Sequence, residues 1–107
     1  MDEHDLVFQQ LIFSLQMQGM IGLGKIMNPL TQKVERNLIV VQSTIETLDA
    51  IRAKTRGNLT EEEQEFLDRT ITDLKLNYVD EVKKEESANS DSDKASDETK
   101  NQKEKKD

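Results

Sequence analysis

The sequence predicts an all-α protein with three helices in an up-down-up arrangement and a disordered C-terminal tail. Apolar residues recur every three to four positions in three separate stretches, which is typical of amphipathic helices. Pro29 separates the first two stretches and Gly57 separates the last two. Beyond residue 84 the chain is almost entirely Ser, Asp, Glu, Lys and Asn, which cannot bury enough apolar surface to offset the entropy of ordering.

The predicted helices cover residues 4–27, 32–56 and 61–84. They form one domain over 1–84, and the disordered charged tail covers 85–107. Acidic residues open the first and third helices and basic residues close all three, a placement that complements the helix dipole. Because the second and third helices are joined by only about four residues, we expect them to form an antiparallel hairpin.

Four residues are predicted to cap these helices. Gly57 follows the second helix, where a left-handed conformation favours glycine. Thr60 and Glu63 form a capping box at the start of the third helix, in which each side chain accepts a hydrogen bond from the other residue's backbone N–H. Thr31, in the turn after Pro29, is the expected N-cap of the second helix.

The second and third helices each carry one apolar stripe. In the second helix the stripe comprises Val34, Leu38, Val41, Ile45 and Leu48. In the third it comprises Leu67, Ile71, Leu74, Tyr78 and Val82. These two stripes are expected to form the core of the hairpin.

The first helix carries two apolar stripes. One comprises Phe8, Leu11, Ile12, Leu15, Leu23 and Ile26, and it is expected to pack on the hairpin. The other comprises Leu6, Phe13, Met17, Met20 and Met27, four of which are seven residues apart. Its methionines are typical either of ordinary core packing or of an adaptable binding surface.

The second stripe predicts an interface, because the hairpin can cover only one side of the first helix. Each large apolar side chain left exposed forgoes about 1.5–3 kcal/mol, and soluble monomers seldom keep such a patch. We therefore expect the first helix to self-associate or to dock on a protein partner. In an alternative arrangement the first helix is detached from the hairpin and becomes ordered only on assembly.

No motif for catalysis or for a cofactor withstands inspection. The run from Gly19 to Lys25 fits G-x-x-x-x-G-K, but Ile26 follows where a phosphate-binding loop needs Ser or Thr, and no strand precedes it. The acidic run 61–63 is explained by its place at a helix N-terminus, and no histidine or second carboxylate cluster is positioned to form a metal site with it. His4 lies near a terminus, and no nucleophile can be paired with it. We expect no catalytic residue, no bound metal and no cofactor.

Charge and composition restrict the partners and the location. The net charge of −7 disfavours nucleic acid and anionic lipid. The first helix contains four glutamines and a lysine, so we expect no membrane span. The chain has no cysteine, and its acidic first residues do not resemble a secretory signal. These features predict a cytoplasmic protein.

Several segments are similar to those of a known family. They are Phe13-Ser14-Leu15, Gln18-Gly19-Met20, Leu23-Gly24-Lys25-Ile26 with Asn28-Pro29, Ile45-Glu46-Thr47-Leu48, the run from Lys54 to Glu63, and Leu74-Lys75-Leu76-Asn77-Tyr78-Val79. They resemble the bacterial family catalogued as domain of unknown function 1844, in which Gln-Ala-Met stands at positions 18–20. The resemblance implies a soluble bacterial protein and supplies no activity and no catalytic residue.

The function that the sequence favours is a non-catalytic helical module that forms a homo-oligomer through the first helix and docks a protein partner. The alternative is a small accessory or regulatory subunit of a larger enzyme complex, in which the same helix binds in a groove of the enzyme.

Overall fold

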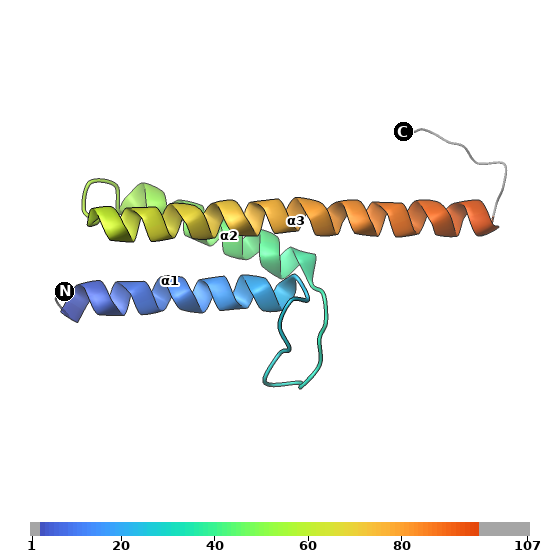
Figure 1. Ribbon diagram of the computed structural model, residues 1–107, viewed down its shortest axis with the longest axis horizontal. Helices are drawn as coiled ribbons and strands as arrows, with labels where there is room; N and C mark the ends of the chain where they lie inside the picture. The colour runs from blue at the N-terminus through green and yellow to red at the C-terminus, as the bar shows by residue number, and fades with distance from the viewer. Residues whose placement is uncertain (1–2, 97–107) are drawn as a thin grey trace.

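The computed structural model describes residues 3–96, which fold into three helices. α1 spans Glu3–Gly22, α2 spans Leu38–Lys54 and α3 spans Glu61–Ser96. α1 and α3 run in the same direction, and α2 runs back in the opposite direction behind them, as Figure 1 shows. The described residues contain no β-strand. The predicted all-α, three-helix fold is confirmed.

All three helices contribute to one apolar core. Its buried residues are Ile12, Leu23, Val41, Ile45, Leu48, Leu67, Ile71 and Leu74. The predicted stripes of the second and third helices supply six of these eight, because the 3.6-residue period brings them to one side of each helix. Leu11, which was expected to meet the hairpin, lies at the edge of the core face and is exposed.

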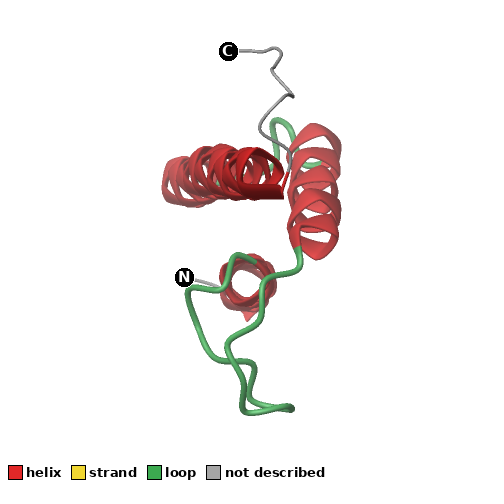
Figure 2. Cartoon of the chain, turned by 90° about the vertical axis from the view of Figure 1, so that its right-hand side faces the viewer, coloured by secondary structure: helices red, strands yellow, loops and turns green. Residues whose placement is uncertain are grey.

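α1 packs directly on both other helices, so it does not stand apart from the hairpin. A Cβ atom on Gly19 would lie 2.7 Å from Leu74 Cδ2 on α3. A Cβ atom on Gly22 would lie 2.8 Å from Val41 Cγ2 on α2. Because glycine has no Cβ atom, it allows α1 to approach both other helices closely at these two positions. Figure 2 shows α1 end-on beneath the other two helices.

α1 ends earlier than the apolar pattern predicts. The N–H of Lys25 donates to the carbonyl oxygen of Met20, and that of Gly24 donates to Ile21, each at 3.0 Å. Gly24 has φ +79°, so these bonds form a Schellman cap around a left-handed glycine. Met27, placed on the helix by the sequence, therefore lies beyond its end.

α2 begins at Leu38, six residues later than predicted, and Thr31 does not cap it. The N-cap is Asn37, whose side-chain oxygen accepts from the N–H of Val40 at 3.3 Å. Asparagine is at least as good an N-cap as threonine, and an apolar run follows it directly. Val34, expected in the core stripe, consequently lies in the loop and is exposed.

A closed turn over residues 28–33 prevents the helix from starting earlier. The N–H of Asn28 donates to the carbonyl oxygen of Lys33 at 2.8 Å, and that of Gln32 donates back to Asn28 at 2.7 Å. The N–H of Leu30 donates to the side-chain oxygen of Asn28 at 2.9 Å. The first of these bonds occupies the carbonyl oxygen of Lys33, which a helix beginning at residue 32 would use as an acceptor.

The connection from α2 to α3 contains the left-handed glycine and the capping box that the sequence predicts. Gly57 has φ +84°. Thr60 Oγ1 accepts from the N–H of Glu63 at 3.1 Å, and Glu63 Oε1 accepts from the N–H of Thr60 at 2.9 Å. The two bonds are those of a capping box.

α3 continues for twelve residues beyond the predicted end at 84. Residues 85–96 contain no proline and no glycine, so nothing in them interrupts a helix that is already nucleated. At 36 residues α3 is about 54 Å long and extends past the other two helices. The remainder of the predicted tail, residues 97–107, lies outside the described residues.

Candidate interaction surface

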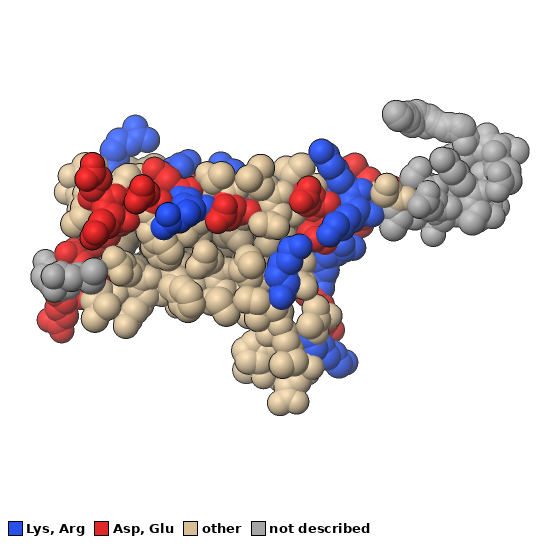
Figure 3. Space-filling model, in the orientation of Figure 1, with Lys and Arg blue, Asp and Glu red and all other residues tan. Residues whose placement is uncertain are grey.

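The most distinctive surface of the protein is the side of α1 that faces away from Ile12 and Gly19. No charged residue occurs between positions 6 and 24, although 35% of the whole chain is charged. We call this side the outer face of α1. It comprises Leu6, Gln10, Phe13, Ser14, Met17 and Ile21. Figure 3 shows it as part of a continuous uncharged region below the charged surface of α3. Phe13 is 54% exposed on this face, and Leu6 is similarly exposed.

A groove of about 780 Å³ runs beside the C-terminal half of the outer face. Its walls are α1, the loop over residues 28–37 and the start of α2. The lining residues are Phe13, Ser14, Met17, Gln18, Ile21, Gly22, Asn28, Pro29, Leu30, Glu35, Asn37 and Val40. Within this lining Glu35 is the one ionisable side chain, so the groove suits apolar or uncharged polar groups.

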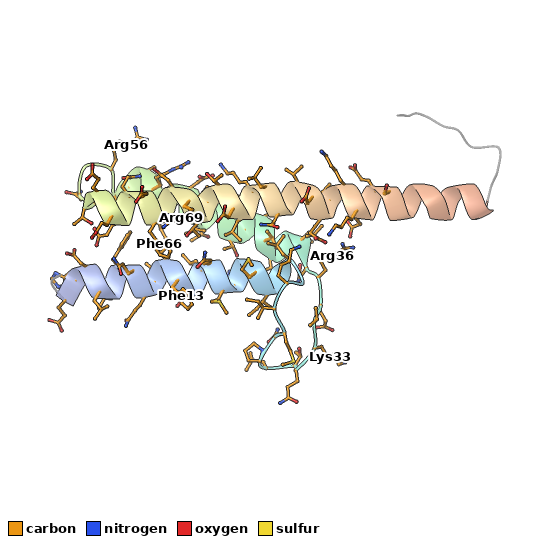
Figure 4. All side chains as sticks on the ribbon, in the orientation of Figure 1. Phe13, Lys33, Arg36, Arg56, Phe66 and Arg69 are labelled. Carbon is orange, nitrogen blue, oxygen red and sulfur yellow. The ribbon has the colours of Figure 1, made fainter. Side chains whose placement is uncertain are left out.

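A second hollow, of about 440 Å³, lies beside the N-terminal half of the same face. It is lined by Leu6, Gln9, Gln10, Phe13, Ser14 and Phe66. Phe66 reaches from α3 toward α1, as Figure 4 shows. We call this the Phe66 hollow. Phe13 and Ser14 line both the groove and the hollow, so they mark the middle of the outer face.

An ion cluster centred on Glu81 of α3 fixes the loop that forms the groove wall. Its carboxylate accepts from Arg36 at 2.8 Å, from Lys84 at 3.1 Å and from Lys25 at 3.4 Å. Arg36 and Lys25 come from opposite ends of the loop. The hydrogen bonds from Arg36, Lys84 and Lys25 outweigh burial and lower the pKa of Glu81 from 4.5 to about 2. The loop is therefore held at both ends by one ionised carboxylate.

Two further hydrogen bonds hold α1 against α2 beside the groove. The backbone N–H of Asn37 donates to the carbonyl oxygen of Gly22 at 2.7 Å. The side-chain amide of Gln18 donates to the hydroxyl of buried Thr44 at 2.7 Å. The groove is thus built between elements that are fixed relative to each other, as preformed binding surfaces are.

The five residues predicted as an interface occupy three different environments. Leu6 and Phe13 lie on the outer face, and Met17 is half-buried in the groove. Met20 instead packs against the core, because its position turns toward the buried side of α1. Met27 is half-exposed beyond the helix end.

Several residues of this surface were not predicted from the sequence. They are Ile21, Pro29, Leu30, Val40 and Phe66. Ile21 follows Met17 by one helical turn, so the periodicity contained that signal. The other four come from the loop, α2 and α3, and only the packing of these elements brings them beside α1.

The run from Gly19 to Lys25, which resembles part of a phosphate-binding loop, has structural roles at Gly19, Gly24 and Lys25. Gly19 allows the contact with α3, Gly24 caps α1, and Lys25 pairs with Glu81 at 3.4 Å. The acidic run 61–63 forms the first turn of α3. Within residues 3–96 no three His, Asp or Glu side chains gather in a geometry that could hold a metal ion.

Comparison with known proteins identifies a family and nothing further. Among the described helices none is both long and apolar enough to cross a membrane. No curated protein and no solved structure shows a significant match to the chain. A family model, described as a domain of unknown function (DUF1844), matches residues 5–80. The match includes α1 without its first two residues, all of α2 and more than half of α3. The chain belongs to this family.

Proposed function

We propose that this chain is a non-catalytic helical module that self-associates through the outer face of α1. The observation that supports the proposal is an apolar face, uncharged over residues 6–24, in a chain of which 35% of the residues are charged and whose charged side chains in Figure 3 lie mainly over α3. Single exposed apolar residues are ordinary on soluble proteins, but a contiguous patch is typical of an interface.

The energetic gain from covering this face is appreciable. Phe13 and Leu6 each keep about half of their surface in water. Burying the exposed half contributes about 1 kcal/mol per side chain. In a symmetric dimer each contribution counts twice, because the same patch is buried on both copies.

The chemistry of the surface supports a binding role over a catalytic one. An active site needs a nucleophile, an acid or a base that converge on one pocket. The groove contributes Glu35 as its ionisable residue, and the lining of the Phe66 hollow contains none. The buried carboxylate of Glu81 is engaged by three cations and acts in holding the loop.

Sedimentation equilibrium at tens of micromolar protein tests the proposal. We expect the wild-type chain to form a discrete oligomer and Phe13→Asp to shift it toward monomer. Leu76→Asp is the matched control, because Leu76 is also a large exposed apolar residue but lies on α3 outside the groove and the hollow. Circular dichroism verifies that both variants keep their helices.

A wild-type chain that stays monomeric would refute self-association and would favour the accessory-subunit hypothesis. Equal loss of the oligomer in Phe13→Asp and in Leu76→Asp would also refute the assignment of the interface to the outer face.

A further inference from the structure

Leu30 forms an apolar projection on a firmly held loop. It is 92% exposed at the tip of the turn that the Asn28–Lys33 bonds close. Figures 1 and 2 show this loop extending from α1 on the side away from α2 and α3. A loop whose backbone is already ordered loses little conformational entropy when a partner covers it. The loop is therefore suited to insert Leu30 into a complementary hollow.

The complementary hollow lies at the other end of the same face. The Phe66 hollow is bordered by Leu6, and its lining contains no charged residue. Leu6 and Ile21 are fifteen residues apart, which corresponds to about 22 Å along the helix axis. A single copy cannot bring Leu30 to this hollow, because the two features lie at opposite ends of α1.

A two-fold axis brings the projection of each copy to the hollow of the other. In an isologous dimer the same patch is used on both sides, so residue i meets residue j and residue j meets residue i. We infer that two copies pair with their α1 helices antiparallel, with the axis near Phe13 and Ser14. Leu30 of each copy then inserts beside Leu6 and Phe66 of the other. This inference rests on the self-association proposed above and specifies its geometry.

The charges at the two ends of α1 favour the antiparallel arrangement. The first turn carries Glu3 and Asp5, whereas Lys33 lies on the projecting loop, as Figure 4 shows. The antiparallel arrangement places Lys33 of one copy near the acidic first turn of the other. A parallel arrangement would place acidic turn beside acidic turn and Lys33 beside Lys33, which is unfavourable.

The area that a dimer requires also argues for the participation of the loop. A helix of 20 residues offers a strip of about 30 by 10–12 Å, or roughly 300–360 Å² in projection. Stable interfaces bury about 800 Å² per partner. The α1 strip falls short of this value, and the loop together with the Phe66 hollow enlarges it at both ends.

Disulfide trapping tests the geometry without interference, because the chain contains no cysteine. Ser14→Cys lies near the inferred axis and is expected to form a disulfide dimer with itself under mild oxidation. Leu30→Cys and Leu6→Cys are each expected to stay uncrosslinked, because two copies of either residue lie far beyond the Cα separation of about 4–7 Å that a disulfide allows. A mixture of these two variants is expected to form the mixed disulfide dimer.

The crosslinking pattern separates failure of the inference from failure of the proposed function. Self-crosslinking of Leu6→Cys and Leu30→Cys would show a parallel pair, and absence of the mixed dimer would exclude the insertion of Leu30. Either result refutes the inferred geometry. If sedimentation nevertheless shows an oligomer, the proposed function is still supported. A monomeric wild-type chain refutes both.

A variant without cysteine gives a second measurement. Leu30→Ala is expected to raise the dissociation constant by about tenfold or more, with an unchanged circular dichroism spectrum, because Leu30 contacts little of its own copy. Ile39→Ala, at an exposed apolar position of α2 outside the groove lining, is expected to leave the dissociation constant unchanged. Equal dissociation constants for wild type and Leu30→Ala would overturn the inference.

Discussion

Replacing Glu81 with Gln removes the charge that holds the groove loop to α3 and keeps the size of the side chain. Glu81 is 5% exposed and accepts hydrogen bonds from three cations at 2.8–3.4 Å. Hydrogen bonds to charged groups contribute about 1.5–3 kcal/mol each. The side chains of Arg36 and Lys25 are each 36% exposed and regain water when the charge is lost, which reduces the net loss. We expect Glu81→Gln to lower the free energy of unfolding by about 2–3 kcal/mol at neutral pH.

The pH dependence of this loss provides a sharper test than its size. The pKa of Glu81 is lowered from 4.5 to about 2 by Arg36, Lys84 and Lys25. A carboxyl whose pKa is lower in the folded state contributes stability that is present above its unfolded pKa and is lost as the pH falls through the folded value. The difference between wild type and Glu81→Gln is therefore expected to be constant above pH 4.5 and to shrink between pH 4.5 and 2.

Urea unfolding followed by circular dichroism, repeated across a pH series, measures the free energy of unfolding of wild type and Glu81→Gln and so gives both the size of the loss and its pH dependence. Glu65→Gln is the matched control, because Glu65 is an exposed carboxylate on the same helix and is expected to change the free energy of unfolding by less than about 0.5 kcal/mol. A stability difference for Glu81→Gln that is as large at pH 2 as at pH 7 would refute the argument, since a protonated Glu81 can no longer attract the cations.

Three further predictions concern the packing of the helices and are measured by the same unfolding assay. Thr70 is buried, and its hydroxyl has no hydrogen-bond partner within the described residues. Thr70→Val is therefore expected to raise the free energy of unfolding by about 1 kcal/mol, and a lower free energy of unfolding would contradict this. Gly22→Ala is expected to lower the free energy of unfolding by more than Gly19→Ala does. A Cβ atom at Gly22 would also lie 3.1 Å from a backbone oxygen, whereas a Cβ atom at Gly19 would meet only the flexible side chain of Leu74. A larger loss for Gly19→Ala would be evidence against rigid packing at the start of α2. Thr60→Ala is expected to cost about 1 kcal/mol through loss of the hydrogen bond to the N–H of Glu63, and no loss would mean that water replaces the cap.

The fold was largely predictable because it depends on local rules. The 3.6-residue period placed Val41, Ile45 and Leu48 on the buried side of α2, and it did the same for the core residues of α3. The connection at Gly57 and Thr60 was predictable for the same reason, since capping geometry involves only neighbouring residues. The start of α2 was not predictable, because hydrogen bonds across the 28–33 turn decided between Thr31 and Asn37.

The candidate surface was predictable only in part. The absence of charge over residues 6–24 and the outward positions of Leu6 and Phe13 follow from the sequence, because the position of a side chain around a helix depends on its number in the chain. The sequence also assigned Met20 and Met27 to that surface. The structure packs Met20, partly buried, against the core and ends α1 before Met27.

The sequence by itself determined that α1 has more apolar surface than one hairpin can cover. Only the tertiary structure decided how that surface is shaped. The groove and the Phe66 hollow each combine α1 with residues from distant parts of the chain, and the exposure of Leu30 depends on a loop that Glu81 holds from α3. Side-chain periodicity within one helix cannot report such contacts, because they arise from the way separate elements pack together.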